Sequence, residues 1–175
     1  MQLNIIMSEK GDQGITQGEC CLSVSKDSVF VETVGTIDRF QARLGWARVE
    51  VIDDTDKKNI FQIEKDLNEV MSSLYVGKNW DNGARRIEEI SGDAELIKNR
   101  VKNIEGFLIP GENEIESRLN ICRTDCREAE RRVVSLKLER EGKEGLELDQ
   151  NVLKYFNRLS YLLNWMWRSS FNEVK

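Results

Sequence analysis

Hydrophobic residues recur three and four positions apart along most of the chain after residue 30. This spacing places them on one face of an α-helix, because a helical turn takes about 3.6 residues. The pattern runs over residues 37–51, 60–74, 93–104, 115–136 and 152–166. It predicts five helices with short connections, an all-α arrangement typical of a helical bundle.

The polar residues between these stretches predict where the helices begin and end. We expect the first helix to start near Glu32 and the segment Lys78–Gly83 to end the second. The third should run from about Asp93 to near Phe107, because Pro110 and Gly111 then favour an extended residue and a turn. Residues 141–145 read as a solvated loop, and Asp149 is a candidate N-cap for the last helix.

The fourth stretch has the most regular pattern, with apolar residues at alternating spacings of four and three. Its members are Ile115, Leu119, Cys122, Cys126, Ala129, Val133 and Leu136. A row of this kind is the buried seam of a bundle helix.

Residues 1–30 lack any such period and are polar and interrupted by glycines. We expect a flexible, irregular arm whose glycines allow the backbone to approach a ligand closely. No composition change or repeat marks a domain boundary, so residues 1–175 are expected to form a single domain.

Composition narrows the functional classes. The chain has 175 residues, 33% of them charged, and a net charge of −5 that disfavours nucleic acid as a partner. Local basic clusters can still bind a small polyanion. No apolar run approaches the length of a membrane span, and the start lacks the basic flank of a signal peptide. We therefore expect a cytoplasmic protein without membrane contacts.

The sequence contains no histidine, which excludes Ser-His-Asp and Cys-His triads and zinc sites that need imidazole. The four cysteines are Cys20, Cys21, Cys122 and Cys126. Small buried thiols in a reducing cell are the favoured interpretation. A four-thiolate metal site remains the alternative, although the spacing is a poor match to zinc patterns.

A polar stripe lies beside the apolar seam of the fourth helix. Asn120, Arg123, Arg127 and Glu130 are three and four residues apart, and Arg131 adjoins them. Arginines in such a row can clamp a polyphosphate or a buried carboxylate. The alternative is a solvated face on which acidic neighbours such as Glu128 neutralise the arginines.

Five segments, taken in order, resemble the motifs of one known family. They match its patterns TKTGDxGxT, SKDD…VEAYGTVDEL, FILPG, ARTxxRRAER and YLNRLSD. In this chain the segments are residues 8–16, 25–38, 107–111, 123–131 and 155–160. Over Ser8 to Arg168 the chain thus resembles the PduO-type ATP:corrinoid adenosyltransferases.

The resemblance implies a five-helix bundle and a homotrimer that binds ATP and a corrinoid between subunits. Such an enzyme transfers the 5′-deoxyadenosyl group of ATP to the reduced cobalt of cobalamin and releases triphosphate. The cobalt is the nucleophile, so no histidine is needed. Mg²⁺ would arrive with ATP without direct protein ligands, and a corrinoid-dependent enzyme or a reductase is a conceivable protein partner.

The resemblance also assigns roles to residues. Asp38 and Arg123 match a catalytic pair that forms a salt bridge, and Phe107 matches the aromatic residue that presses on the lower face of the corrin. The residues that would hold ATP are Ser8, Lys10, Gly11, Thr16, Lys26, Arg127, Glu130, Arg131 and Asn157.

Several positions depart from the family pattern. Glu128 stands where the family has an arginine, which places an anion beside the phosphate-binding row unless a partner such as Arg39 compensates it. The other departures are Glu9, Ser23, Arg39, Gln41, Glu112, Asn120 and Tyr161. They leave open an alternative, a catalytically weak paralogue that serves as a nucleotide- or corrinoid-binding sensor or carrier.

Overall fold

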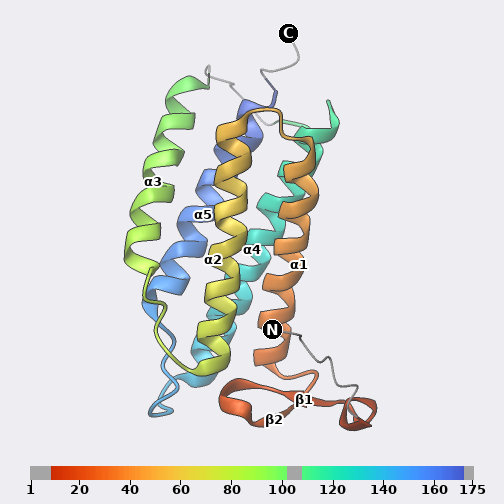
Figure 1. Ribbon diagram of the computed structural model, residues 1–175, viewed down its shortest axis with the longest axis vertical. Helices are drawn as coiled ribbons and strands as arrows, with labels where there is room; N and C mark the ends of the chain where they lie inside the picture. Colours follow the sequence, from red (N-terminus) through yellow and green to blue (C-terminus); the bar gives the residue numbers. More distant parts are fainter. Residues whose placement is uncertain (1–8, 102–107, 172–175) are drawn as a thin grey trace.

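A computed structural model describes residues 9–101 and 108–171, with side chains from residue 11 onward. Five long helices run side by side, and a short hairpin lies at one end of the bundle (Figure 1). The helices are α1 (Val29–Glu50), α2 (Asp54–Val76), α3 (Gly83–Arg100), α4 (Glu114–Arg140) and α5 (Gln150–Ser169). The predicted five-helix bundle is therefore confirmed.

Polar N-caps start four of the helices. The side chains of Ser28, Asp53, Asn113 and Asp149 each accept a hydrogen bond from a backbone N–H in the first turn. These bonds satisfy donors that have no partner within the helix. Gly77 ends α2 in the left-handed conformation, with φ 67°, which glycine adopts without strain.

Three predicted boundaries were wrong, the start of the first helix and both ends of the third. The first helix begins at Val29 rather than near Glu32, because Ser28 caps it one turn earlier. The third helix begins at Gly83, about ten residues before the expected start near Asp93, and ends at Arg100. Its first half is rich in charge and buries only one narrow row, which includes Arg86 and Ile90, so periodicity alone did not reveal it.

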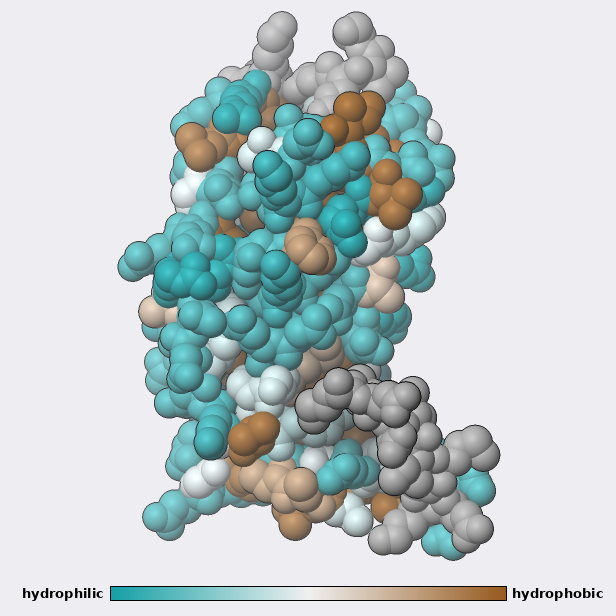
Figure 2. Space-filling view, in the orientation of Figure 1, coloured by the Kyte–Doolittle hydropathy of each residue, from teal (hydrophilic) through white to brown (hydrophobic). Residues whose placement is uncertain are grey.

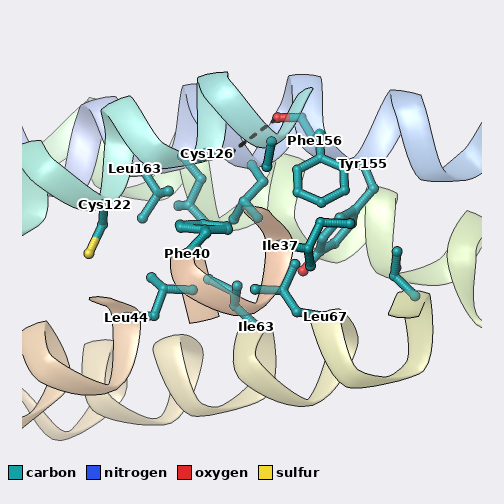
Figure 3. Close-up of a cluster of buried hydrophobic side chains, with 14 of the residues drawn as sticks. Ile37, Phe40, Leu44, Ile63, Leu67, Cys122, Cys126, Tyr155, Phe156 and Leu163 are labelled. Carbon is teal, nitrogen blue, oxygen red and sulfur yellow. Dashed lines mark hydrogen bonds between the residues drawn. The ribbon is translucent and has the colours of Figure 1, made fainter. Parts of the chain in front are cut away.

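The core lies where α1, α2, α4 and α5 meet (Figure 3). Phe40 and Leu44 of α1 face Ile63 of α2 and the row of α4, and Phe40, Leu44 and Ile63 are each no more than 1% exposed. The row predicted for α4 is buried from Leu119 to Leu136. Burying such side chains stabilises a fold by about 1.5–3 kcal/mol each, so this seam organises the bundle.

A buried polar cluster joins α2, α3 and α5. Arg86 Nε lies 2.8 Å from Asp66 Oδ2, and the Tyr155 hydroxyl donates to the same oxygen at 2.7 Å. Asp66 and Arg86 are almost fully buried, and burial raises the pKa of Tyr155 well above its ordinary value. Because α3 packs on α5, this cluster fixes the position of α3 against the rest of the bundle.

The N-terminal arm contains a hairpin that the sequence did not predict. β1 (Ile15–Gln17) pairs antiparallel with β2 (Ser23–Ser25). The short helix η1 (Glu9–Gln13) precedes β1, and η2 (Glu19–Cys21) connects the two strands. A buried ion pair of 2.8 Å joins Glu19 to Arg140 at the end of α4. The hairpin is therefore attached to the base of the bundle.

The face shown in Figure 2 is mostly hydrophilic, and its apolar side chains gather in separate patches. Within the described ranges, no helix has the length and apolar character needed to cross a bilayer.

The cysteines divide into two pairs. Cys122 and Cys126 are buried in the core as expected, whereas Cys20 and Cys21 are exposed on the arm, contrary to the expectation of buried thiols. Burial raises the pKa of Cys122 to about 12 and that of Cys126 well above its ordinary value. Among residues 9–101 and 108–171, no three metal-ligating side chains come together, so the four thiols do not share one site.

This division predicts thiol reactivity. The thiolate is the reactive form, and a raised pKa keeps the core thiols protonated at pH 8. With a disulfide reagent at pH 8, Cys20 and Cys21 of the native protein should react rapidly. Cys122 and Cys126 should react only after denaturant is added. Rapid reaction of all four thiols without denaturant would contradict the buried placement.

Candidate functional site

Helix α4 carries polar side chains on both sides of its buried seam. On one side it faces α1, where Arg39 Nη2 lies 2.8 Å from Glu128 Oε2. On the other side it faces α5, where the Asn157 amide donates to Glu130 Oε1 at 3.3 Å. The stripe predicted from sequence therefore lies at the solvent side of α4, and α1 and α5 flank it.

Arg123, Arg127 and Arg131 line a cleft of about 270 Å³ along this stripe. Within the described ranges, none of the three guanidiniums forms an ion pair with a carboxylate. Arg123 donates to the Asn120 side chain at 2.8 Å and lies over the Trp167 ring, 4.9 Å from its centroid. Asp125 and Glu128 also line the cleft, but their ion pairs are with arginines of α1. Among the described residues, the three guanidiniums of the cleft therefore have no ion-paired carboxylate.

The pKa of Arg123 reflects this crowding. Partial burial lowers it, and the neighbouring Arg127 and Arg168 lower it further because they repel a third positive charge. An anion bound in the cleft would remove this repulsion and satisfy the unpaired donors. The arrangement suits a polyanion such as an oligophosphate.

The carboxylate of Glu128 forms an ion pair with an arginine of α1. Arg39, the partner that the sequence analysis considered for it, lies 2.8 Å away, and Arg39 is also 3.9 Å from Asp125. Arg43 lies 3.7 Å from the other oxygen of Asp125. The charge of Glu128 is therefore neutralised by α1.

Glu130 and Asn157 border a second cleft of about 360 Å³ between α3, α4 and α5. Its walls include the apolar side chains of Ile87, Val134 and Leu153. The larger cleft of about 450 Å³ near the end of α2 contains none of the predicted site residues. The predicted residues of α4 and α5 thus meet at two adjoining clefts of their own.

The arm residues gather around one lysine. Lys26 Nζ donates to the Gly11 carbonyl at 2.6 Å, and the Lys26 backbone N–H donates to the Gly14 carbonyl at 2.8 Å. Thr16 lies in β1, beside this loop. The loop therefore brings Gly11, Thr16 and Lys26 together. Ser8 and Phe107 lie outside the described residues, as does the side chain of Lys10.

Within one chain, the arm lies far from the arginine cleft. The arm is attached at Arg140, and Arg127 precedes Arg140 by thirteen residues on the same helix. That separation corresponds to about 20 Å along the axis. Figure 1 likewise shows the hairpin at one end of the bundle, beyond the start of α1.

Asp38 and Arg123 are not paired within the chain either. Asp38 is exposed and lies two turns before Gly45, on the edge of α1 that faces Glu64 of α2. Arg123 lies on the opposite side, where α4 faces α5. A salt bridge between these residues therefore requires a second copy of the chain.

Two residues of this region carry no signal in the sequence. Glu116 and Trp167 are buried and hydrogen-bonded to each other, and the Trp167 ring supports Arg123. Neither belongs to a motif, and their contact spans 51 positions, so no local signal identified it.

Comparison with known proteins gives consistent results. A family model described as cobalamin adenosyltransferase matches residues 6–170. Corrinoid adenosyltransferase PduO of Salmonella typhimurium is 31% identical over 97% of the chain, and the chain spans about half (50%) of its length. Corrinoid adenosyltransferase of Bacillus subtilis is 28% identical, over 91% of the chain and 81% of that protein.

A solved structure has the same fold. It is a variant of a PduO-type ATP:corrinoid adenosyltransferase from Lactobacillus reuteri complexed with cobalamin and ATP. The TM-score is 0.79 at 21% identity, and the match covers 94% of this chain and 92% of that one.

The Arg39–Glu128 pair leads to a stability prediction. Glu128→Arg would replace the anion that lies 2.8 Å from Arg39 with a second cation, and should lower the free energy of unfolding by about 1 kcal/mol, measured by urea denaturation. The double variant Arg39→Glu/Glu128→Arg reverses the pair and should recover most of the loss. Equal stability of the single variant and the wild type would show that the pair does not form.

Proposed function

Because the chain belongs to the cobalamin adenosyltransferase family, we propose that it transfers the 5′-deoxyadenosyl group of ATP to the reduced cobalt of a corrinoid. The bond between C5′ and the triphosphate oxygen breaks as the cobalt–carbon bond forms. Triphosphate leaves with the electron pair of the broken bond. The observation that carries this proposal is the cleft on α4 whose three arginines form no ion pair with any described carboxylate, while its acidic residues pair with α1.

The residues of the cleft would stabilise the leaving group. Arg123, Arg127 and Arg131 can donate hydrogen bonds to triphosphate oxygens as negative charge develops on them. Glu130 and Asn157 border this region and would orient the nucleotide and its Mg²⁺. The protein needs no base or nucleophile of its own, since the cobalt substrate supplies the electron pair.

We further propose that the site is completed between subunits of a homotrimer. The arm of one chain, with Ser8, Lys10, Gly11, Thr16 and Lys26, would close over the arginine cleft of the next. Asp38 of one chain would pair with Arg123 of its neighbour, and Phe107 would face the corrin. The separation of these groups within one chain supports this arrangement.

Residues 1–175 would act as one domain in this assembly. A cytoplasmic location is part of the proposal, because four free cysteines suit a reducing compartment.

The decisive experiment supplies ATP, Mg²⁺ and chemically reduced cobalamin and follows adenosylcobalamin by absorbance. Wild type should form adenosylcobalamin and triphosphate in equal amounts. Arg127→Met should lower kcat/KM by about 10–100-fold, because it removes a charged donor from the leaving group. Arg100→Met, an exposed arginine at the end of α3, is the matched control and should be unchanged. ATP and corrinoid binding without any product would instead identify a sensor or carrier.

Subunit mixing tests the proposed interface. Asp38→Asn and Arg123→Met should each lose most transfer activity, measured with saturating substrates. Mixed and reassembled in equal amounts, they should recover about a quarter of wild-type activity, because one interface in four then has both native residues. Light scattering should give about three times the chain mass of 20.3 kDa. Mixtures that stay inactive would show that one chain supplies both residues.

A further inference from the structure

Glu116 is a fully buried carboxylate in the first turn of α4, with an exposed fraction of 0%. Within the described ranges, no lysine or arginine forms an ion pair with it. A buried charge of this kind is costly unless hydrogen bonds satisfy it. Its position near the start of α4 also helps, because the helix dipole favours a negative charge there. An uncharged residue would avoid this cost. The presence of a carboxylate here therefore needs an explanation, and its contacts provide one.

Each carboxylate oxygen binds a different part of the chain. The Gly111 backbone N–H donates to Glu116 Oε2 at 2.6 Å. The Trp167 indole N–H donates to Oε1 from the end of α5. Gly111 has φ 117°, a conformation that favours glycine, so the turn has a specific shape that the carboxylate holds. Glu116 therefore joins the turn before α4 to the end of α5.

Trp167 carries this link onward to the arginine cleft. Its ring is 7% exposed, and the Arg123 guanidinium lies 4.9 Å from its centroid. A cation over an indole face is attracted by the ring and held in place. At the other end of this series of contacts, the turn at residues 108–111 directly follows Phe107 in sequence. The chain of contacts thus runs from the turn through Glu116 and Trp167 to Arg123.

From this geometry we infer that Glu116 is a positioning residue that couples the turn at residues 108–111 to Arg123. The inference rests on the proposed function, in which Phe107 faces the corrin and Arg123 belongs to the nucleotide site. Because Glu116 is fully buried, it would act without touching either substrate. It fixes the position of the turn relative to Arg123. The corrinoid beside the turn would then be held in a fixed position relative to the nucleotide.

The test is Glu116→Gln, which keeps the shape of the side chain. The amide has one acceptor oxygen and one NH₂ group, so it can accept from Gly111 or from Trp167 but not from both. Trp167→Phe is the second variant, since it removes the indole N–H and keeps an aromatic ring beneath Arg123. Glu112→Gln is the control, because it makes the same change at an exposed position of the same turn.

Two readouts decide the matter. In Glu116→Gln, hydrogen exchange measured by NMR should be about tenfold faster at the Gly111 amide or at the Trp167 indole, because one of them loses its acceptor. In the transfer assay, the KM for cobalamin should rise about five- to tenfold in both variants while the KM for ATP stays within about twofold. Glu112→Gln should resemble wild type in both measurements.

Exchange at wild-type rates in Glu116→Gln would overturn the inference, and so would equal changes in the two KM values, which indicate a general loss of structure. If wild type itself shows no transfer, the proposed function fails. The exchange measurement, with cobalamin binding followed by titration, then still decides whether Glu116 holds the turn.

Discussion

The structure depends on the apolar seam of α4. Its residues are buried against α1 and α5, so the helix has one fixed rotation about its axis. That rotation decides where every other side chain of α4 points. Asp125 and Glu128 face the arginines of α1, Glu130 faces Asn157 of α5, and Arg127 and Arg131 are exposed to solvent. The distribution of charge on the surface is thus a consequence of packing in the core.

This distribution leaves the positive charge where a polyanion could use it. Asp125 and Glu128 are paired with Arg39 and Arg43, whereas Arg123, Arg127 and Arg131 of the same cleft form no ion pair with a carboxylate among the described residues. A chain with a net charge of −5 can therefore still hold a local site for phosphate. The replacement of an arginine by Glu128 is compensated from α1, so it need not weaken this site.

The groups that the proposed reaction needs are spread over three edges of the molecule. The Lys26 loop lies at the base, Asp38 lies towards α2, and Arg123 lies towards α5. Each is attached to a rigid helix or to a hairpin that a buried ion pair anchors. Rigid placement on separate edges is what a site shared between identical subunits requires, since each chain then contributes a preformed part.

The sequence by itself determined the helical class, the seam of α4, the polar stripe beside it and the cap at Asp149, because these features depend on local spacing and on single residues. It placed the start of α3 about ten residues too late, since only the tertiary cluster of Asp66, Arg86 and Tyr155 makes that charged segment a packed helix. It also did not reveal the hairpin, which depends on pairing and on the Glu19–Arg140 contact. The sequence offered Arg39 as a possible partner of Glu128, and the tertiary structure decided that this pair forms. The tertiary structure alone decided that Glu116 binds Trp167 and that Asp38 and Arg123 point apart. These outcomes depend on which helices become neighbours, and no local pattern encodes that.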